Sequence, residues 1–254
     1  LFFRFSTAGY LTTIALGTLL LVAAAASYAV RWGWHGVVPL LAVSLLVLIP
    51  ASELTIQIVQ RGISRIIPPR RLPRLELERV PADFRTMVIV PTMLDSIERA
   101  EELLAHLEVQ ALGNVDPHVH FALLTDFRDA TSETLPQDAA ILDAATSGIR
   151  ALNQKHPGDS GDRFFLFHRQ RQWNDGEGLW MGWERKRGKI DEFNHLLRGA
   201  TDTSFVVSEG NLSLLPQVRY CITLDSDTRL PRDCAKQLIG IIAHPLNRPG
   251  FDPA

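Results

Sequence analysis

The tripeptide Asp225-Ser226-Asp227 directly follows an apolar stretch, residues 220–224, that has the composition of a buried strand. Two carboxylates separated by one residue can turn towards one point and bind a hard divalent cation such as Mg²⁺ or Mn²⁺ through oxygen. Such a cation would hold a diphosphate and stabilise it as a leaving group. Asp-x-Asp is a common pattern, so a surface turn is the alternative; the preceding apolar strand favours the metal site.

Two further polar residues follow predicted strands: Thr92 comes after residues 87–90, and Asp126 comes after residues 118–124. In open α/β sheets, ligands bind outside the carboxyl ends of the strands. We therefore expect these side chains and the acidic tripeptide to face one crevice. Asp126 could accept a hydrogen bond from a nucleobase or ribose there, although capping of the following helix explains it almost as well.

A basic segment, residues 183–189, carries four cations in seven residues: Arg185, Lys186, Arg187 and Lys189. Together they could hold the oxygens of a diphosphate. A solvated charged loop is an equally good interpretation of this composition.

Aromatic and histidine side chains give weaker signals. Trp173, Trp180 and Trp183 could form a platform for sugar rings, or pack in the core. His118 and His120 would share one face of a strand, but no neighbouring residue completes a metal coordination shell, so we interpret them as ordinary strand residues.

The elements that must position these residues alternate between short apolar runs and amphipathic helices. This βαβ pattern predicts an α/β domain with a largely parallel sheet. The predicted strands are residues 87–90, 118–124, 164–168 and 220–224, and the predicted helices are 95–112, about 136–155, one from about 189 and one from near 231.

The first part of the chain is almost uncharged. Residues 8–30 contain no charged side chain and are long enough to cross the ~30 Å hydrocarbon core of a bilayer. A second apolar run begins at Val37 and predicts a tilted span to about Ile58, with a kink at Pro50. A cleaved signal peptide, the alternative for the first run, fails on length and on the missing cleavage site. A buried core helix is the alternative for the second run.

Charge divides the chain into three regions. Residues 1–59 form a two-helix membrane segment, residues 60–83 an arginine-rich interfacial helix and linker, and residues 84–254 the α/β domain. The arginine-rich stretch predicts that the domain lies on the cytoplasmic side of the membrane, with Arg4 returned to the same side. The two cysteines, Cys221 and Cys234, fit neither a zinc site nor a disulfide framework.

The chain resembles the glycosyltransferase part of bacterial cyclic β-1,2-glucan synthases, which are related to processive family-2 glycosyltransferases. The resemblance covers most of the chain. Its most specific motifs are residues 90–92 (VPT), 120–130 (HFALLTDFRDA), 180–189 (WMGWERKRGK), 220–228 (YCITLDSDT) and 244–249 (HPLNRP).

The resemblance implies a GT-A-like, Rossmann-like mixed sheet, UDP-glucose as donor, Mg²⁺ or Mn²⁺, and extension of a protein-linked β-1,2-glucan. Thr92 and Asp126 match the family's uridine-contacting positions, and Asp225 with Asp227 match its metal motif. Lys189 and Asn194 have the spacing of a Lys-Ala-Gly-Ala-Leu-Asn motif beside the donor. The implied partners are UDP-glucose, the glucan acceptor, the lipid bilayer and the rest of a longer polypeptide, with no nucleic acid.

The family also requires a later catalytic aspartate and a Gln-x-x-Arg-Trp acceptor motif, and neither follows Asp227 before Ala254. We therefore expect a truncated transferase domain that binds donor and metal without transferring glucose alone. Incorporation of glucose from UDP-glucose by the isolated chain would contradict this expectation.

Two other functions compete with this one. An apolar strand followed by Asp225-Ser226-Asp227-Thr228 also fits the first motif of haloacid-dehalogenase-type phosphatases, with Asp225 as nucleophile and Asp227 as acid. That motif belongs on the first strand, whereas three predicted strands precede it here. The second competing hypothesis is a non-catalytic membrane anchor with a transferase-like fold.

Overall fold

The computed structural model describes residues 6–67, 69–159, 161–247 and 250. It divides into two compact units, Leu1–Arg71 and Leu72–Ala254. Arg4, to which the topology prediction assigned a side of the membrane, lies outside the described residues, as do positions 248 and 249 of the last family motif.

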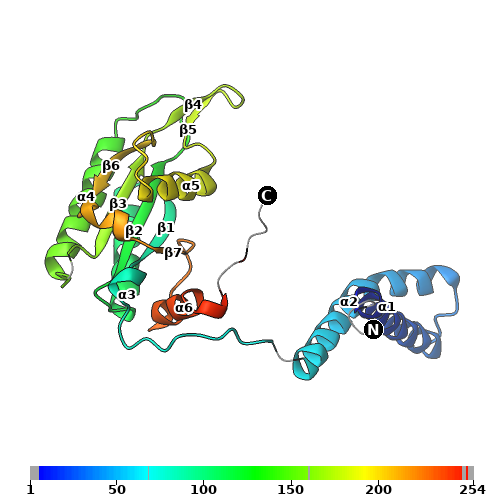
Figure 1. Ribbon diagram of the computed structural model, residues 1–254. Helices are drawn as coiled ribbons and strands as arrows, with labels where there is room; N and C mark the ends of the chain where they lie inside the picture. The colour runs from blue at the N-terminus through cyan, green and yellow to red at the C-terminus, as the bar shows by residue number, and fades with distance from the viewer. Residues whose placement is uncertain (1–5, 68, 160, 248–249, 251–254) are drawn as a thin grey trace. The chain divides into compact units, whose positions relative to one another are not determined.

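The first unit consists of two long apolar helices, α1 (Ser6–Arg31) and α2 (Val37–Ile66) (Figure 1). Both are long enough and apolar enough to cross a membrane, and only 6% of each apolar window is buried. Neither helix is buried against the described residues of this chain, as a core helix would be. Pro50 lies within α2 without ending it, so the predicted second span and interfacial helix form one continuous helix of about 45 Å.

Small side chains bring α1 and α2 together. Thr18 on α1 and Ala51 and Thr55 on α2 are buried among otherwise exposed apolar residues. A Cβ atom at Gly17 would lie 2.5 Å from the Thr55 side chain, closer than van der Waals contact allows. Gly17 therefore permits the close approach of the two helices, as small residues do between membrane helices.

We expect Gly17→Leu to weaken this helix pair by about 1–3 kcal/mol, because the larger side chain overpacks the contact with Thr55. The check is the distance between spin labels at positions 10 and 60, whose native side chains are joined by a hydrogen bond of 3.2 Å, in a cysteine-free background. That distance should lengthen and broaden. Gly9→Leu is the matched control, since nothing lies within 4 Å of a Cβ at Gly9; equal effects of both changes would contradict the prediction.

Among the described residues of the second unit, five strands form one mixed sheet in the order β6-β3-β2-β1-β7. The strands β1 (Thr86–Leu94), β2 (Val119–Phe127), β3 (Phe164–Arg169) and β7 (Tyr220–Thr223) run parallel, with β7 at one edge of the sheet. The edge strand β6 (Phe205–Glu209) is antiparallel to β3. A second, two-stranded sheet consists of β4 (Gln172–Asn174) and β5 (Leu179–Met181).

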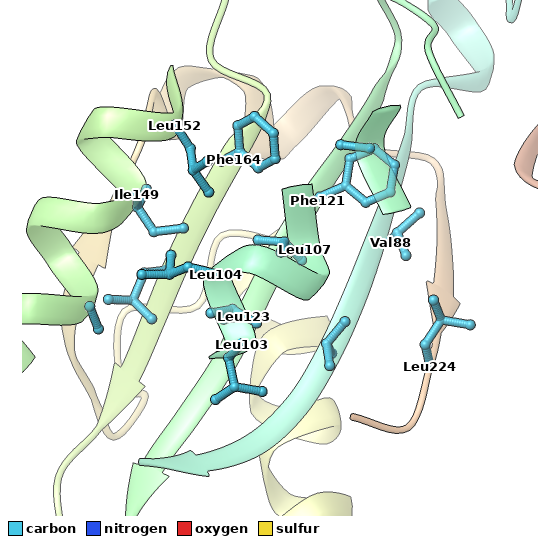
Figure 2. Close-up of a cluster of buried hydrophobic side chains, with 14 of the residues drawn as sticks. Val88, Leu103, Leu104, Leu107, Phe121, Leu123, Ile149, Leu152, Phe164 and Leu224 are labelled. Atoms are coloured by element: carbon cyan, nitrogen blue, oxygen red, sulfur yellow. The ribbon is translucent and has the colours of Figure 1, made fainter. Parts of the chain in front are cut away.

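Helices pack on both faces of the five-stranded sheet (Figure 1). Alternate strand residues such as Val88 and Phe121 pack with α3 (Ile97–Gly113), α4 (Asp138–Lys155) and α6 (Cys234–Ile242), as Figure 2 shows for the first two helices. The intervening residues pack with α5 (Arg185–Leu197) and the 3₁₀ helix η3 (Leu212–Gln217). Because both faces of β2 and β3 are covered, every residue of these two strands is buried.

The remaining short elements are the 3₁₀ helices η2 (Ala82–Phe84) and η4 (Pro245–Asn247). The segment that precedes η2 belongs to the second unit, because the Leu75 backbone N–H donates to the carbonyl oxygen of Gly240 at 2.9 Å. Part of the predicted arginine-rich linker is therefore packed along α6.

Candidate active site

Three candidate residues lie at one edge of the sheet. In the parallel pair of β1 and β2, Thr92 is opposite Thr125 and Met93 is opposite Asp126. The strand β7 pairs with β1, and the Leu224 N–H continues the ladder to the Ile89 carbonyl oxygen at 3.0 Å, one residue before Asp225. Thr92 and Asp126 therefore lie within the last residues of β1 and β2, rather than after them as the sequence predicted, and Asp225 lies just beyond β7. All three are at the carboxyl ends of adjacent parallel strands, the usual place for ligands in such sheets.

Asp126 is buried between two cations. Its Oδ1 accepts a hydrogen bond of 2.7 Å from Lys189 Nζ, and its Oδ2 accepts one of 2.9 Å from Arg169. Lys189 also donates to the Thr92 carbonyl oxygen at 2.5 Å. Burial lowers the pKa of the Lys189 ammonium, and the negative charge of Asp126 opposes that shift. Thr92, Asp126 and Lys189 are thus brought into direct contact.

Arg169 is the centre of this buried network. Asp126 and Arg169 are register partners on β2 and β3, so their side chains share the sheet face covered by α5. Arg169 is fully buried and also contacts Glu192 of α5 at 3.3 Å. Glu192 in turn accepts hydrogen bonds of 3.0 and 2.6 Å from the backbone N–H and hydroxyl of Ser204. Two anions therefore balance two cations in the interior.

The same guanidinium holds the start of α5, which contains the four basic residues that the sequence also allowed to be a charged loop. Arg169 donates to the carbonyl oxygens of Trp183 and Arg185 at 3.0 and 3.2 Å. The packing here is close: a Cβ at Gly182, before α5, would lie 2.3 Å from Asp126 Oδ2, and a Cβ at Gly188, within α5, would lie 2.1 Å from the Trp183 carbonyl oxygen. Arg169 is not among the site residues predicted from the sequence, although an arginine at the end of an otherwise apolar strand is a signal of such a role.

The acidic tripeptide lies at the surface. Asp225 and Asp227 are exposed, and Asp225 forms an ion pair with Lys186 of α5. Asp227 lines a small pocket with His106 and Gln110 of α3. The two carboxylates thus have different neighbours. In the part of the chain that the structure describes, no group of three or more His, Cys, Asp or Glu side chains is arranged to hold a metal.

This donor set still fits a divalent cation that arrives with a diphosphate. Mg²⁺ commonly takes one or two protein carboxylates and completes its octahedron with water and substrate phosphate oxygens. Two exposed carboxylates beside a cationic helix terminus provide those ligands without a preformed cage. Asp225 and Asp227 would hold such a cation, and Lys186 forms an ion pair with Asp225.

The remaining candidates have simpler environments. Asn194 is half-buried in a shallow surface pocket of α5 that also includes Lys186, Arg187 and Ile190. It lies five residues beyond Lys189, on a different side of the helix from that buried ammonium.

The two histidines at the start of β2 have protein partners. His118 Nδ1 contacts the Val80 carbonyl oxygen at 2.7 Å. His120 contacts Arg85 and the Asp162 carbonyl oxygen, each at 2.9 Å. These contacts agree with the interpretation of both histidines as structural residues.

The tryptophans differ in exposure. Trp173 and Trp183 are each 49% exposed, and Trp180 is half-buried against Trp173. None belongs to the buried hydrophobic clusters of the second unit, so core packing does not explain them among the described residues.

No family model matches the chain. It is 43% identical over 211 residues to the cyclic beta-(1,2)-glucan synthase NdvB of Rhizobium meliloti (strain 1021). The match covers 82% of this chain but only 7% of the length of that relative. The chain is therefore homologous to a region of a cyclic beta-(1,2)-glucan synthase.

Proposed function

We propose that the chain is the donor-binding part of a membrane-bound glycosyltransferase that uses UDP-glucose to extend a protein-linked β-1,2-glucan in cyclic glucan synthesis. The homologue suggests a glycosyltransferase with a role in glucan synthesis. The observation that carries the donor assignment is the convergence of Thr92, Asp126 and Asp225 at the carboxyl edge of adjacent parallel strands. The mixed sheet with helices on both faces is compatible with a GT-A fold.

The side chains divide into two groups with different roles. The buried group of Asp126 and Lys189, packed beneath Thr92, would shape the surface that receives the nucleoside. The exposed group of Asp225 and Asp227 would bind Mg²⁺ or Mn²⁺ together with the diphosphate, and Asn194 would lie beside the donor. When bound, the cation would stabilise the negative charge that develops on the departing UDP.

The membrane assignment rests on the first unit. Two candidate spans precede the domain, and exposed arginines at 61, 65, 70 and 71 follow the apolar part of α2. Because basic residues are retained on the cytoplasmic side, we propose a bacterial inner-membrane protein with residues 84–254 in the cytoplasm, where UDP-glucose is made available.

Titration of the full chain with UDP-glucose in the presence of Mn²⁺ tests the donor assignment. We expect calorimetric binding that requires the metal and that weakens at least about tenfold when Asp225→Asn and Asp227→Asn are combined, because charge-assisted contacts are worth about 1.5–3 kcal/mol each. Asp143→Asn, at an exposed position of α4, is the matched control and should bind as the parent does.

The competing functions give different results in the same experiment. A non-catalytic anchor would show no metal-dependent binding in the parent chain, or binding that the double substitution leaves unchanged. A phosphatase would release phosphate from an aryl phosphate without UDP and would lose that activity with Asp225→Asn. The observed chain order disfavours the phosphatase, since β7 follows the other strands of the sheet.

A further inference from the structure

The hairpin of β4 and β5 is not explained by the proposed donor site. Such a two-stranded unit is marginally stable alone, and here it is attached through Ala130, whose N–H and carbonyl each pair with Trp180 at 2.9 Å. The strands align Trp173 with Trp180. Their rings meet edge to face, with centroids 5.9 Å apart and planes at 60°. The hairpin therefore presents a supported aromatic pair at the surface.

The exposed ring of this pair is held in one orientation. Trp173 Nε1 donates a hydrogen bond of 2.7 Å to Asp175 Oδ1, and Trp180 supports the ring from the side. The turn between β4 and β5 is stabilised by its own hydrogen bond, which Asn174 Oδ1 accepts from the Gly176 N–H at 2.9 Å. A fixed aromatic surface binds a ligand with little loss of side-chain entropy. This arrangement favours a recognition role over a packing role.

The polar residues near Trp173 indicate which class of ligand this surface could bind. Asp175, which accepts the hydrogen bond from Trp173 Nε1, and Glu177 of the same turn are both exposed. Their carboxylates would repel a phosphate backbone, which disfavours a nucleic acid or a second nucleotide. A pyranose has an apolar C–H face that stacks on an aromatic ring and a rim of hydroxyl groups that donate to carboxylates and amides. An uncharged sugar chain therefore fits this surface.

Chain continuity places this surface beside the donor site. The strand β5 ends at Met181, and the next residue, Gly182, lies against the carboxylate of Asp126. Trp183 follows, with its carbonyl oxygen bound by Arg169. A sugar chain on the hairpin would thus lead towards the edge of the sheet where the donor is proposed to bind.

We propose that the β4–β5 hairpin binds the glucan chain, with the face of Trp173 stacked on a glucose ring and Asp175 and Glu177 accepting hydrogen bonds from its hydroxyl groups. The identity of the sugar rests on the proposed function. The hairpin itself is a carbohydrate-binding surface distinct from the residues that would hold UDP-glucose.

Calorimetric titration of the full chain with short linear β-1,2-linked gluco-oligosaccharides tests this assignment. The chain must be in nanodiscs or in a detergent without a sugar headgroup, because glucoside and maltoside detergents would compete for the ring. Trp173→Ala should weaken oligosaccharide binding about tenfold or more, as truncation of an aromatic anchor does. Trp173→Phe, which keeps an aromatic face, should retain much of the affinity.

Trp34→Ala is the matched control, because Trp34 has a similar exposure of 52% and lies between α1 and α2. Metal-dependent UDP-glucose binding, measured on the same samples, should be unchanged by Trp173→Ala, which also shows that the variant is folded. Glucan binding that depends on Trp173 without any UDP-glucose binding would uphold the hairpin and reject the donor site. Equal glucan affinity of parent and Trp173→Ala, or no glucan binding by the parent, would overturn the inference.

Discussion

Replacing Asp126 with alanine is expected to destabilise the second unit by about 3–5 kcal/mol, because the change leaves two buried cations without their shared counter-ion. Lys189 and Arg169 are both within hydrogen-bond distance of this carboxylate, at 2.7 and 2.9 Å, and all three side chains are at most 2% exposed. Glu192 can compensate only part of that charge. The measurement is the free energy of unfolding from urea titration, followed by circular dichroism.

Two comparisons separate this effect from a general loss of side-chain contacts. Glu102→Ala removes the acid of an exposed ion pair with Arg99, and should change stability by less than about 1 kcal/mol. Adding Lys189→Met to Asp126→Ala removes the unpaired ammonium, so the double variant should be more stable than the sum of the single changes predicts. Additive effects, or an Asp126→Ala effect no larger than that of Glu102→Ala, would contradict the buried-pair interpretation.

This network also shows where sequence reasoning reached its limit. The βαβ pattern predicted the parallel core, and β1, β2, β3 and β7 form within a few residues of the predicted strands because each is a short apolar run. The meeting of Thr92 and Asp126 at one edge follows from that topology alone. The pairing of Asp126 with Arg169 could not be predicted, since it depends on the register between β2 and β3.

Strands without a strong apolar pattern were not predicted, because their positions also depend on contacts with distant parts of the chain. The strand β6 lies at an antiparallel edge of the sheet, where half-buried residues alternate with exposed ones and none is fully buried. The strands β4 and β5 are only three residues long each and lie in a polar, tryptophan-rich stretch. Their positions are determined by partners elsewhere in the fold, such as Ala130 for β5. The passage of α2 through Pro50, by contrast, agrees with the predicted span to about Ile58, and the helix extends further, to Ile66.

Acid is expected to unfold the second unit through two buried histidines. Desolvation by burial is the main cause that lowers the pKa of His120 and of His168 from 6.5 to about 4 in each case. His120 is neutral between Arg85 and the Asp162 carbonyl oxygen. His168 lies against Thr125 Oγ1 at 2.9 Å and against the Phe127 ring. The Asp162 carbonyl oxygen favours protonated His120, and the charges of Asp126 and Asp138 favour protonated His168, but desolvation outweighs them and the pKa of each histidine is lowered.

The direction of the effect follows from proton linkage. Above about pH 6.5 both histidines are neutral whether the chain is folded or unfolded, so they add no pH dependence. Between about pH 6.5 and 4 the unfolded chain binds protons that the folded chain excludes, and stability falls as the pH decreases. Each histidine contributes on the order of 3 kcal/mol over this interval. Two such contributions approach the whole stability of an ordinary domain.

The measurement is the free energy of unfolding at pH 7.5 and at pH 4.5 for the parent, His120→Gln and His168→Gln. Each variant should lose less stability on acidification than the parent does, even if it is less stable at neutral pH. Carboxylates also titrate in this range, but they are common to all three proteins and cancel in the comparison. His106→Gln, at an exposed position of α3, should follow the parent. If the buried variants show the same acid sensitivity as His106→Gln, the proton uptake must come from other groups.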